Sequence, residues 1–406
     1  MKVLFYNHTG QVGGAERLLL TLLERLDRSE FAPVLICPSQ GPLRRLADEA
    51  GLRTETIDGL KARFTWRVDH LAGYLNSIRQ LVRQLRQKVV DVQPDLIHAN
   101  SVRAGLVATL ATIGLKPVVV WHIHDLLPRH PLTAVIRAIA LGSRRTRIIA
   151  VAQASADRMT ANIGSLRRRT TVIPNAVDLH AKTAPGADTA QRIRRELHID
   201  EHASVIGMIG RLTPAKGQLE VIKLFPKILS RLPNARLIIV GAPAFNNEHE
   251  YQQLLKQTIA EMDLSDRILM LGARDDVDDI LQAIDLLVVN SASEACSLVI
   301  LEAMASGTPV LATSTGGTPE IIEHQTNGWL VTFGKDDELL EGVSTMLSDQ
   351  VLRQRLSTQA RQNASVRHTI PRFMSEMQGF YRSVLANGKI PQQKKLPQFK
   401  VSLSPD

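Results

Sequence analysis

The stretch "LLVVNSASEACSLVILEAMASGTPVLATS", residues 286–314, contains a strand, a loop, a helix and a second strand in succession. Its ends, "LLVVN" (286–290) and "PVLATS" (309–314), are short apolar runs typical of strands that are buried on both faces. Between them, a polar loop leads into "LVILEAMASG" (298–307), where the apolar residues predict a buried helix. This order predicts two parallel strands in one sheet, connected by a helix that covers it.

Units of the same kind fill the rest of the chain in two series, with helical segments such as "GGAERLLLTLLERL" (13–26) between the strands. The first series is "KVLFYN" (2–7), "PVLICP" (33–38), "DLIHAN" (95–100), "PVVVWHIH" (117–124) and "RIIAVAQ" (147–153). The second adds "VIGMIGRL" (205–212), "RLIIVGA" (236–242) and "RILMLGA" (267–273) to the two strands quoted first. We therefore expect an α/β protein with two doubly wound, Rossmann-like domains that face a central cleft. Ligands of such sheets bind outside the carboxyl ends of the strands.

The expected domains are 1–182 and 183–368, with the Ala-, Pro- and Gly-rich stretch "DLHAKTAPGADTAQ" (178–191) as the linker. A last helix, 369–388, is expected to pack back toward the first domain. The polar, Pro-containing tail 389–406 is expected to be poorly ordered.

The composition is that of a globular protein, with 44% hydrophobic and 22% charged residues among 406. Its two cysteines, Cys37 and Cys296, lie far apart without metal-ligand spacing, which favours a reducing compartment. The chain opens without a signal-peptide pattern, and no apolar stretch approaches the roughly 18 residues of a membrane-spanning helix. We expect a cytoplasmic protein, either soluble or peripheral at the cytoplasmic face of a membrane.

The net charge of +9 is unevenly distributed, because residues 1–185 hold 26 Lys and Arg against 14 Asp and Glu, whereas the remainder holds 23 against 26. Basic segments recur at 77–88 (Arg79, Arg83 and Arg86), 130–147 and 165–170. They suit an anionic membrane surface, and a solvated basic face explains them equally well. Nucleic acid is a weaker expectation, because aromatic residues make up only 4% of the chain and no base-stacking platform is evident.

Two cations occur where a strand of the second series gives way to a helix, in "GRLTPAKGQ" (210–218). Arg211 ends the strand, and Lys216 stands just before the helix. Two fixed cations beside a helix N-terminus form a good diphosphate site. The alternative is a solvated loop with two surface charges.

An acid, Glu302, interrupts the apolar helix of the opening stretch, and no Arg or Lys occurs between 275 and 334 to pair with it. A buried carboxylate needs a partner, and the vicinal hydroxyls of a ribose would supply one. Glu294 lies in the preceding loop, and the helix start at 297–299 offers free N–H groups to an anion. In the alternative interpretation, Glu302 lies on an exposed stripe and Glu294 is a capping acid.

Other motifs follow strand ends. "HTGQVGGAER" (8–17) lacks both dinucleotide and P-loop spacing, so its Gly13 and Gly14 are expected to allow close approach to a phosphate or sugar. "STGGTPEII" (314–322) has a second Gly pair. "WHIHDLLP" (121–128) places His124 at a strand end, where a histidine is more often structural unless it points into a cleft.

Taken in order, "GGAER", "HIHD", "IPNAVD" (173–178), "IGRLTPAKG", Glu-x7-Glu at 294 and 302, and "GGTPE" cover nearly the whole chain. With these motifs the chain resembles a retaining glycosyltransferase of the GT-B fold, in group 1, family 4. The resemblance implies transfer of a hexose-type sugar from a UDP- or GDP-sugar to a glycan or lipid-linked acceptor, in cell-surface polysaccharide or glycolipid synthesis. No metal or other cofactor would be required, and "RDDVDD" (274–279) would be a surface turn rather than a metal motif.

The resemblance also assigns roles to residues. Arg211 and Lys216 would hold the diphosphate, Glu302 the ribose, and Glu294 the hydroxyls of the donor sugar. His124 would contact the donor sugar near the reacting centre. The remaining donor-binding positions are Gly13, Gly14, Ser297, Leu298 and Val299.

Two departures from the family pattern leave the donor sugar open: Ala295-Cys296-Ser297 replaces Gly-Phe-Gly, and Asn175-Ala176 replaces Asn-Gly. Two other functions also stay open, a nucleotide-sugar epimerase or hydrolase of the same fold and a catalytically silent nucleotide-sugar-binding subunit. A dinucleotide-dependent oxidoreductase is disfavoured because the fingerprint is missing from both halves.

Overall fold

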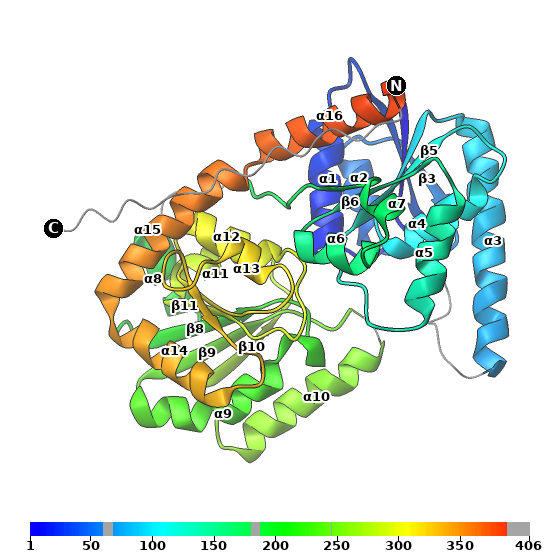
Figure 1. Cartoon of the computed structure of the whole chain (residues 1–406). Coiled ribbons are helices and arrows are strands. Elements are labelled where there is room, and N and C mark those ends of the chain that lie inside the picture. The colour runs from blue at the N-terminus through cyan, green and yellow to red at the C-terminus, as the bar shows by residue number, and fades with distance from the viewer. Residues whose placement is uncertain (60–67, 180–186, 245, 388–406) are drawn as a thin grey trace.

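The computed structural model describes residues 1–59, 68–179, 187–244 and 246–387. It consists of two α/β domains, each with a parallel sheet between layers of helices (Figure 1). The predicted fold class, two Rossmann-like domains, is confirmed.

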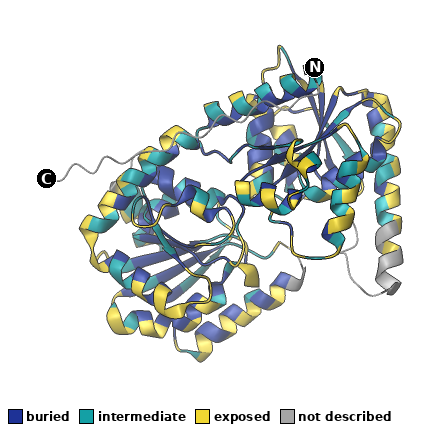
Figure 2. Cartoon of the chain, in the orientation of Figure 1, coloured by how far each residue is buried: buried dark blue, intermediate teal, exposed yellow. Residues whose placement is uncertain are grey.

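The first domain has a seven-stranded sheet with the order β3-β2-β1-β4-β5-β6-β7. Its strands are β1 (Lys2–Tyr6), β2 (Ala32–Pro38), β3 (Thr54–Ile57), β4 (Leu96–Ala99), β5 (Val118–Ile123), β6 (Thr146–Ala150) and β7 (Thr170–Val172). The edge strands β3 and β7 were not predicted from the sequence, because "TETI" and "TTV" are short and half polar. The central strands are almost fully buried (Figure 2).

Helices cover both faces of this sheet. They are α1 (Gly14–Arg25), α2 (Pro42–Glu49), α3 (Val68–Val92), α4 (Val102–Ala111), α5 (Leu132–Gly142), α6 (Gln153–Thr160) and α7 (Gly164–Arg167). Helices α1 and α2 contribute to one core cluster, whereas α3 to α7 contribute to the other. The basic segments predicted from the sequence thus lie on the α3, α5 and α7 side of the sheet.

The second domain has a six-stranded sheet with the order β10-β9-β8-β11-β12-β13. Its strands are β8 (Ser204–Ile209), β9 (Ala235–Val240), β10 (Ile268–Gly272), β11 (Leu286–Val289), β12 (Val310–Thr313) and β13 (Trp329–Val331). Its helices are α8 (Ala187–Glu196), the 3-10 turn η1 (Pro214–Lys216), α9 (Gln218–Arg231), α10 (Asn246–Glu261), α11 (Val277–Ala283), α12 (Leu298–Ser306), α13 (Thr318–Ile321), α14 (Asp336–Ser348) and α15 (Gln350–Arg367).

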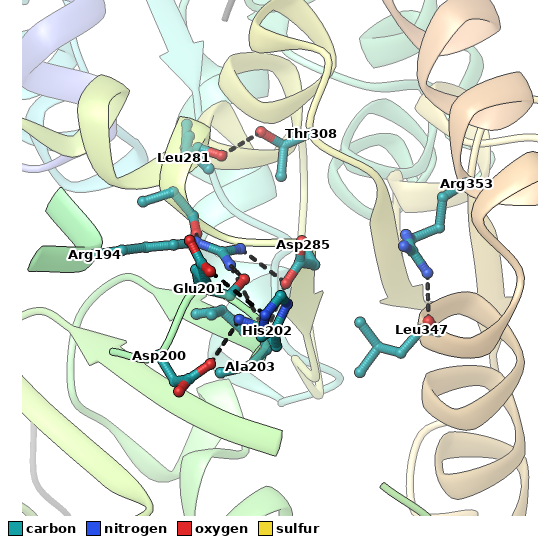
Figure 3. Close-up of polar contacts among 12 residues, drawn as sticks. Arg194, Asp200, Glu201, His202, Ala203, Leu281, Asp285, Thr308, Leu347 and Arg353 are labelled. Atoms are coloured by element: carbon teal, nitrogen blue, oxygen red, sulfur yellow. Dashed lines mark hydrogen bonds and ion pairs between the residues drawn. The ribbon is translucent and has the colours of Figure 1, made fainter. Parts of the chain in front are cut away.

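Helix α8 is fixed to the amino ends of β8 and β11 through Arg194 (Figure 3). The guanidinium donates to the carbonyl oxygens of Ala283 (2.9 Å), Glu201 (3.2 Å) and Ala203 (3.3 Å). It also pairs with Asp285 at 2.9 Å. The predicted linker 178–191 is therefore too long, because α8 already begins at Ala187; residues 180–186 lie outside the described part of the chain.

The last helix, α16 (Ile370–Asn387), runs back along the first domain (Figure 1). Its Phe373, Phe380 and Tyr381 are buried in the same core cluster as α1. Arg382 pairs with Glu30 through two nitrogens, at 2.6 Å for the shorter contact. The tail predicted at 389–406 lies outside the described residues.

Candidate active site

Polar residues gather where the carboxyl ends of the two sheets meet. The domains touch there: a Cβ atom added to Gly14, at the start of α1, would stand 3.1 Å from the side chain of Leu298, at the start of α12. A Cβ atom on Gly316, in the loop after β12, would meet the side chain of Leu126 of the first domain at 2.4 Å. The structure thus brings the predicted residues Gly14 and Leu298 into contact.

The structure also brings Lys216 and Glu294 together as an ion pair. Ser291 donates a second hydrogen bond to the Glu294 carboxylate, at 2.8 Å. The side chains of Lys216 and Glu294 are 29% and 11% exposed, so the pair is largely shielded yet reachable by a ligand. The bland interpretation of Lys216 as a surface charge and of Glu294 as a capping acid is therefore wrong.

A glycine allows this pairing. Gly217 has a φ of +67°, and a Cβ atom there would stand 2.2 Å from the carbonyl oxygen of Asn290. Only glycine tolerates both the left-handed backbone and so close an approach. The turn that carries Lys216 therefore lies directly against the end of β11, and the Ala292 N–H donates to the Ala215 carbonyl at 2.9 Å.

Arg211 lies at the end of β8, where its Nε is 3.4 Å from a carboxylate oxygen of Glu248. The Glu248 side chain is only 7% exposed, and it also accepts a hydrogen bond from the Ala244 N–H at 2.8 Å. It therefore positions a guanidinium that is itself 46% exposed. Glu248 was missed from the sequence, since no motif surrounds it.

A second missed residue is Asp125, which follows His124 in the "HIHD" motif. Desolvation raises the pKa of its carboxyl, and the nearby Glu294 raises it further, against the opposing charges of Arg211, Arg103 and Lys216. These neighbours come from both domains. Asp125 therefore shares the electrostatic environment of the predicted cations.

Helix α12 starts at Leu298, with Ser297 as its N-cap, and the Ser297 side chain makes no capping hydrogen bond. The Ser297 side chain therefore leaves the first-turn N–H groups available to an anion, as the sequence predicted.

The structure corrects the sequence interpretation of Glu302. Its side chain is half-buried rather than buried, and it already takes part in an interaction within the protein. The argument from a costly unpaired carboxylate is therefore wrong, and its contact with a ribose stays a prediction.

His124 belongs to a chain of polar side chains beneath the strand ends of the first domain. Its Nε2 is 3.0 Å from Oδ1 of Asn100, and Asn100 donates to Asn7 at 3.0 Å. Asn7 donates to Glu16 at 3.3 Å, and Glu16 accepts the Gly13 N–H at 3.0 Å.

This chain changes what His124 and Gly13 can offer a ligand. The Nδ1 atom of His124 is buried and finds no hydrogen-bond partner among the described residues. Burial lowers the pKa of His124 to about 3, so the ring is neutral. The Nε2 atom of His124 and the N–H of Gly13 are thus engaged within the protein, whereas Nδ1 of His124 has no such partner in the described part of the chain.

A small pocket lies beside this cluster in the second domain, lined by Lys216, Gln218, Ser291, Val299 and apolar residues of β8 and β11. Within the described residues, no three His, Cys, Asp or Glu side chains form a cluster that could hold a metal ion. In "RDDVDD", Arg274 pairs with Asp276 at 2.7 Å, while Asp278 and Asp279 stand in the first turn of α11.

The overall architecture agrees with solved glycosyltransferase structures. The structure of Anabaena HepE in complex with UDP-glucose matches with a TM-score of 0.81 and 28% sequence identity, over 94% of this chain and 100% of that chain. The same protein in complex with UDP and glucose matches with a TM-score of 0.80. The fold is therefore GT-B, the class of two facing Rossmann-like domains.

Family models cover both domains: "Glycosyltransferase Family 4" matches residues 12–181, and "Glycosyl transferases group 1" matches residues 189–363. The chain belongs to the group 1 glycosyltransferases. A relative from Escherichia coli, "UDP-Gal:alpha-D-GlcNAc-diphosphoundecaprenol alpha-1,3-galactosyltransferase", is 25% identical over 84% of this chain and 86% of its own length. A "D-inositol 3-phosphate glycosyltransferase" from Corynebacterium urealyticum is 27% identical over 93% and 92%.

Proposed function

We propose that the protein is a retaining, metal-independent hexosyltransferase that uses a UDP- or GDP-sugar. Its acceptor would be a glycan or lipid-linked saccharide of cell-surface polysaccharide or glycolipid synthesis. The observation that carries this proposal is the partly shielded Lys216–Glu294 pair beside Arg211. A nucleotide diphosphate develops negative charge as it leaves, and fixed cations stabilise that charge in the transition state.

The names of the relatives favour a uridine nucleotide. HepE was solved with UDP-glucose, and the Escherichia coli relative is described as using UDP-Gal on a diphosphoundecaprenol-linked sugar. The retained anomeric configuration is proposed from the motif resemblance.

The pairing suggests how the donor is recognised. Without a ligand, Lys216 and Glu294 neutralise one another. A donor diphosphate would compete for the Lys216 ammonium and release the Glu294 carboxylate to accept hydrogen bonds from hydroxyls of the donor sugar. Arg211, held by Glu248, would supply the second cation. In this mechanism the Glu294 carboxylate binds the donor sugar only after the diphosphate has bound to Lys216.

The test is thermal unfolding and calorimetry with UDP, GDP, ADP and TDP, with EDTA in place of metal, because a ligand that binds the folded state raises its stability. Selective stabilisation by UDP or GDP is expected, and retention is then read by NMR from the anomeric proton of the product. Turnover of the donor without acceptor would favour the epimerase or hydrolase. Nucleotide binding without any turnover would favour the silent subunit, and no binding at millimolar concentration would contradict the donor assignment.

We further propose that the first domain docks on the cytoplasmic face of an anionic membrane. Helix α5 exposes Val135 (54%) together with Ala134 and Ala138, and the exposed Arg144 and Arg145 follow its end. An apolar stripe with basic flanks suits a lipid interface. None of the helices in the described residues is long and apolar enough to cross a membrane.

Not all the predicted basic residues are available for docking. Arg86 donates to the carbonyl oxygens of Ala111 (2.9 Å) and Ile113 (2.8 Å), where it caps α4. Arg137 donates to the carbonyl oxygens of Met159 and Arg158 and so caps the end of α6.

Flotation with anionic vesicles tests the docking proposal. Val135→Asp is expected to reduce co-flotation at low salt, whereas Val351→Asp, at a 79% exposed apolar residue of α15, is expected to leave it unchanged. Equal loss in both variants, or no flotation of the unmodified protein, would contradict it.

A further inference from the structure

The "GGTPE" motif (316–320) has no part in the donor chemistry proposed above, and it lies at the boundary between the domains. A Cβ atom on Gly317 would stand 1.9 Å from the Ala295 carbonyl oxygen and 2.7 Å from the Ala152 side chain. Gly316, with a φ of +55°, would place a Cβ atom 2.0 Å from the Glu294 carbonyl oxygen. The Gly pair therefore fits between the Glu294 loop and the first domain.

The acid of the motif reaches across the boundary. The Glu320 carboxylate accepts the N–H groups of Gln153 and Ala154 through its two oxygens, each at 2.7 Å. These are the first N–H groups of α6, a helix of the first domain whose own N-cap, Ala152, has no side-chain acceptor. An N-terminus without a cap leaves N–H groups in need of an acceptor, and a carboxylate also suits the helix dipole. The second domain thus caps a helix of the first.

The same loop supports Glu294. The Gly317 N–H donates to the Glu294 carbonyl oxygen at 2.9 Å. From the first domain, the Asn175 amide donates to the Cys296 carbonyl oxygen at 2.7 Å. Of these two contacts, the Asn175 hydrogen bond crosses between the domains. The backbone next to Glu294 is therefore held in part by the first domain.

The chain crosses between the domains twice, and the two crossings lie side by side. The Val177 N–H donates to the His368 carbonyl oxygen at 2.8 Å, and the His368 ring lies 3.0 Å from the Asn175 carbonyl oxygen. Adjacent crossings are the natural place for a hinge. The Glu320 contact is separate in sequence from both crossings.

We propose that Glu320 is an interdomain latch: its carboxylate, bound to the N-terminus of α6, holds the domains closed and thereby positions Glu294, with the donor sugar it would hold, against the first domain. The catalytic consequence rests on the proposed function, whereas the latch itself does not. Glu320 touches neither donor nor acceptor in this proposal and acts as a positioning residue. Release of the latch leaves Arg211, Lys216 and Glu294 together in the second domain and displaces all three relative to the first domain.

Two variants break the latch from opposite sides. Glu320→Gln keeps the size and shape of the side chain but replaces one acceptor oxygen by an NH2 group. This NH2 group would face a backbone N–H donor, so one of the two hydrogen bonds is lost. Gln153→Pro removes one donor at the first position of α6, where proline is well tolerated, and it follows Ala152, which already has the extended backbone that precedes proline. If one variant fails to fold, the other remains a test. Glu323→Gln, at an exposed acid three residues further along, is the matched control.

The measurement is single-molecule FRET between dyes on cysteines introduced at the exposed Gln87 of α3 and Lys256 of α10. Both latch variants are expected to gain a population with a different interdomain separation, and the control to match the unmodified protein. A distribution identical to the unmodified one in both variants would overturn the latch.

Turnover and UDP binding are measured on the same proteins. We expect kcat to fall at least about tenfold, since small displacements of catalytic groups have large effects, while the Kd for UDP changes by less than about threefold. A latch variant with altered FRET and unchanged kcat would overturn the positioning role. Absence of UDP binding and turnover in the unmodified protein would refute the proposed function and leave the FRET result on the latch intact.

Discussion

Acidification from pH 7.5 to 5.5 should strongly destabilise the first domain, because two neutral histidines lie in its core. His98 of β4 and His122 of β5 are 0% and 1% exposed. The His98 Nδ1 lies 2.8 Å from the Tyr381 hydroxyl of α16, and its Nε2 lies 3.2 Å from Nδ1 of His122. These contacts suit neutral rings, and no carboxylate among the described residues raises the pKa of either ring.

Burial lowers the pKa of His98 from 6.5 to about 3 and that of His122 well below 6.5. The unfolded chain therefore binds protons that the folded chain does not, and the free energy of unfolding falls as the pH drops through 6.5. At pH 5.5 each ring should cost about 1.4 kcal/mol, or about 3 kcal/mol for the pair. His8 and His124 of the same domain, whose pKa values burial also lowers, add to this loss. That is a large part of the roughly 5–15 kcal/mol by which domains are stable. Burial raises the pKa values of the Glu16 and Asp125 carboxyl groups. Protonation of these groups at lower pH would increase the free energy of unfolding and oppose the effect of the histidines, so the measurement stops at pH 5.5.

The assay is urea unfolding followed by tryptophan fluorescence in a Trp66→Phe/Trp329→Phe background, which leaves Trp121, fully buried in the first domain, as the single reporter. His98→Gln should lower stability at pH 7.5 and flatten its dependence on pH by up to one proton. His202→Gln, at a side chain that is 81% exposed, should leave the dependence unchanged. Identical pH slopes for the unmodified protein and His98→Gln would refute the argument.

Other substitutions test the second domain. Arg194→Ala should cost about 2 kcal/mol of stability by urea unfolding, since it removes the donor to the partly buried carbonyl oxygens of Ala283 and Ala203 and the ion pair with Asp285. The exposed neighbour Arg195→Ala should cost little. Lys216→Ala should weaken UDP binding about tenfold by calorimetry while leaving the thermal midpoint nearly unchanged. Glu294→Gln should abolish most turnover without weakening UDP binding, because it frees Lys216 for the diphosphate; weaker binding would contradict the competition mechanism. Glu302→Gln should weaken UDP binding about tenfold if the carboxylate holds the ribose, and unchanged affinity would refute that role.

The strands that could be predicted from the sequence are those buried on both faces. Strands such as β1, "KVLFY", and β9, "ARLIIV", carry apolar residues at nearly every position, which leaves little alternative to a central parallel strand. The edge strands β3 and β7 lack this pattern, because their few residues are half polar and partly exposed. The edge strand β13, "WLV", is apolar but only 3 residues long, whereas the longer edge strand β10 was predicted. The predicted linker 178–191 also ran into α8, since Ala and Gly near a helix start look the same as in a linker.

The residues of the candidate site also fall into those that could be predicted from the sequence and those that could not. Lys216 was found because it stands beside Gly217 in the turn that follows a strand, and Glu294 because it lies in the loop between a strand and an apolar helix, eight residues before Glu302. Glu248 and Asp125 were missed, because their importance arises from side chains that approach from other segments. Burial of Glu302 was predicted from the apolar residues around it, but "LVILEAMAS" is not equally covered on all sides and Glu302 faces its less covered side.

The histidines show how far a motif alone can mislead. "WHIHD" places two rings two residues apart, so both point to the same side of β5, and their centroids lie 4.0 Å from one another. The His122 ring forms a hydrogen bond with His98, and the His124 ring forms one with Asn100. The His124 ring therefore supports the polar chain that leads through Asn7 to the Gly13 backbone. Its neighbour Asp125 supplies a carboxyl group near the cations of the second domain. If this is correct, His124→Gln should preserve part of the activity through its hydrogen bond to Asn100, whereas His124→Ala should remove both the activity and part of the stability; equal loss of turnover in the two variants at equal stability would instead assign the imidazole a direct part in the chemistry.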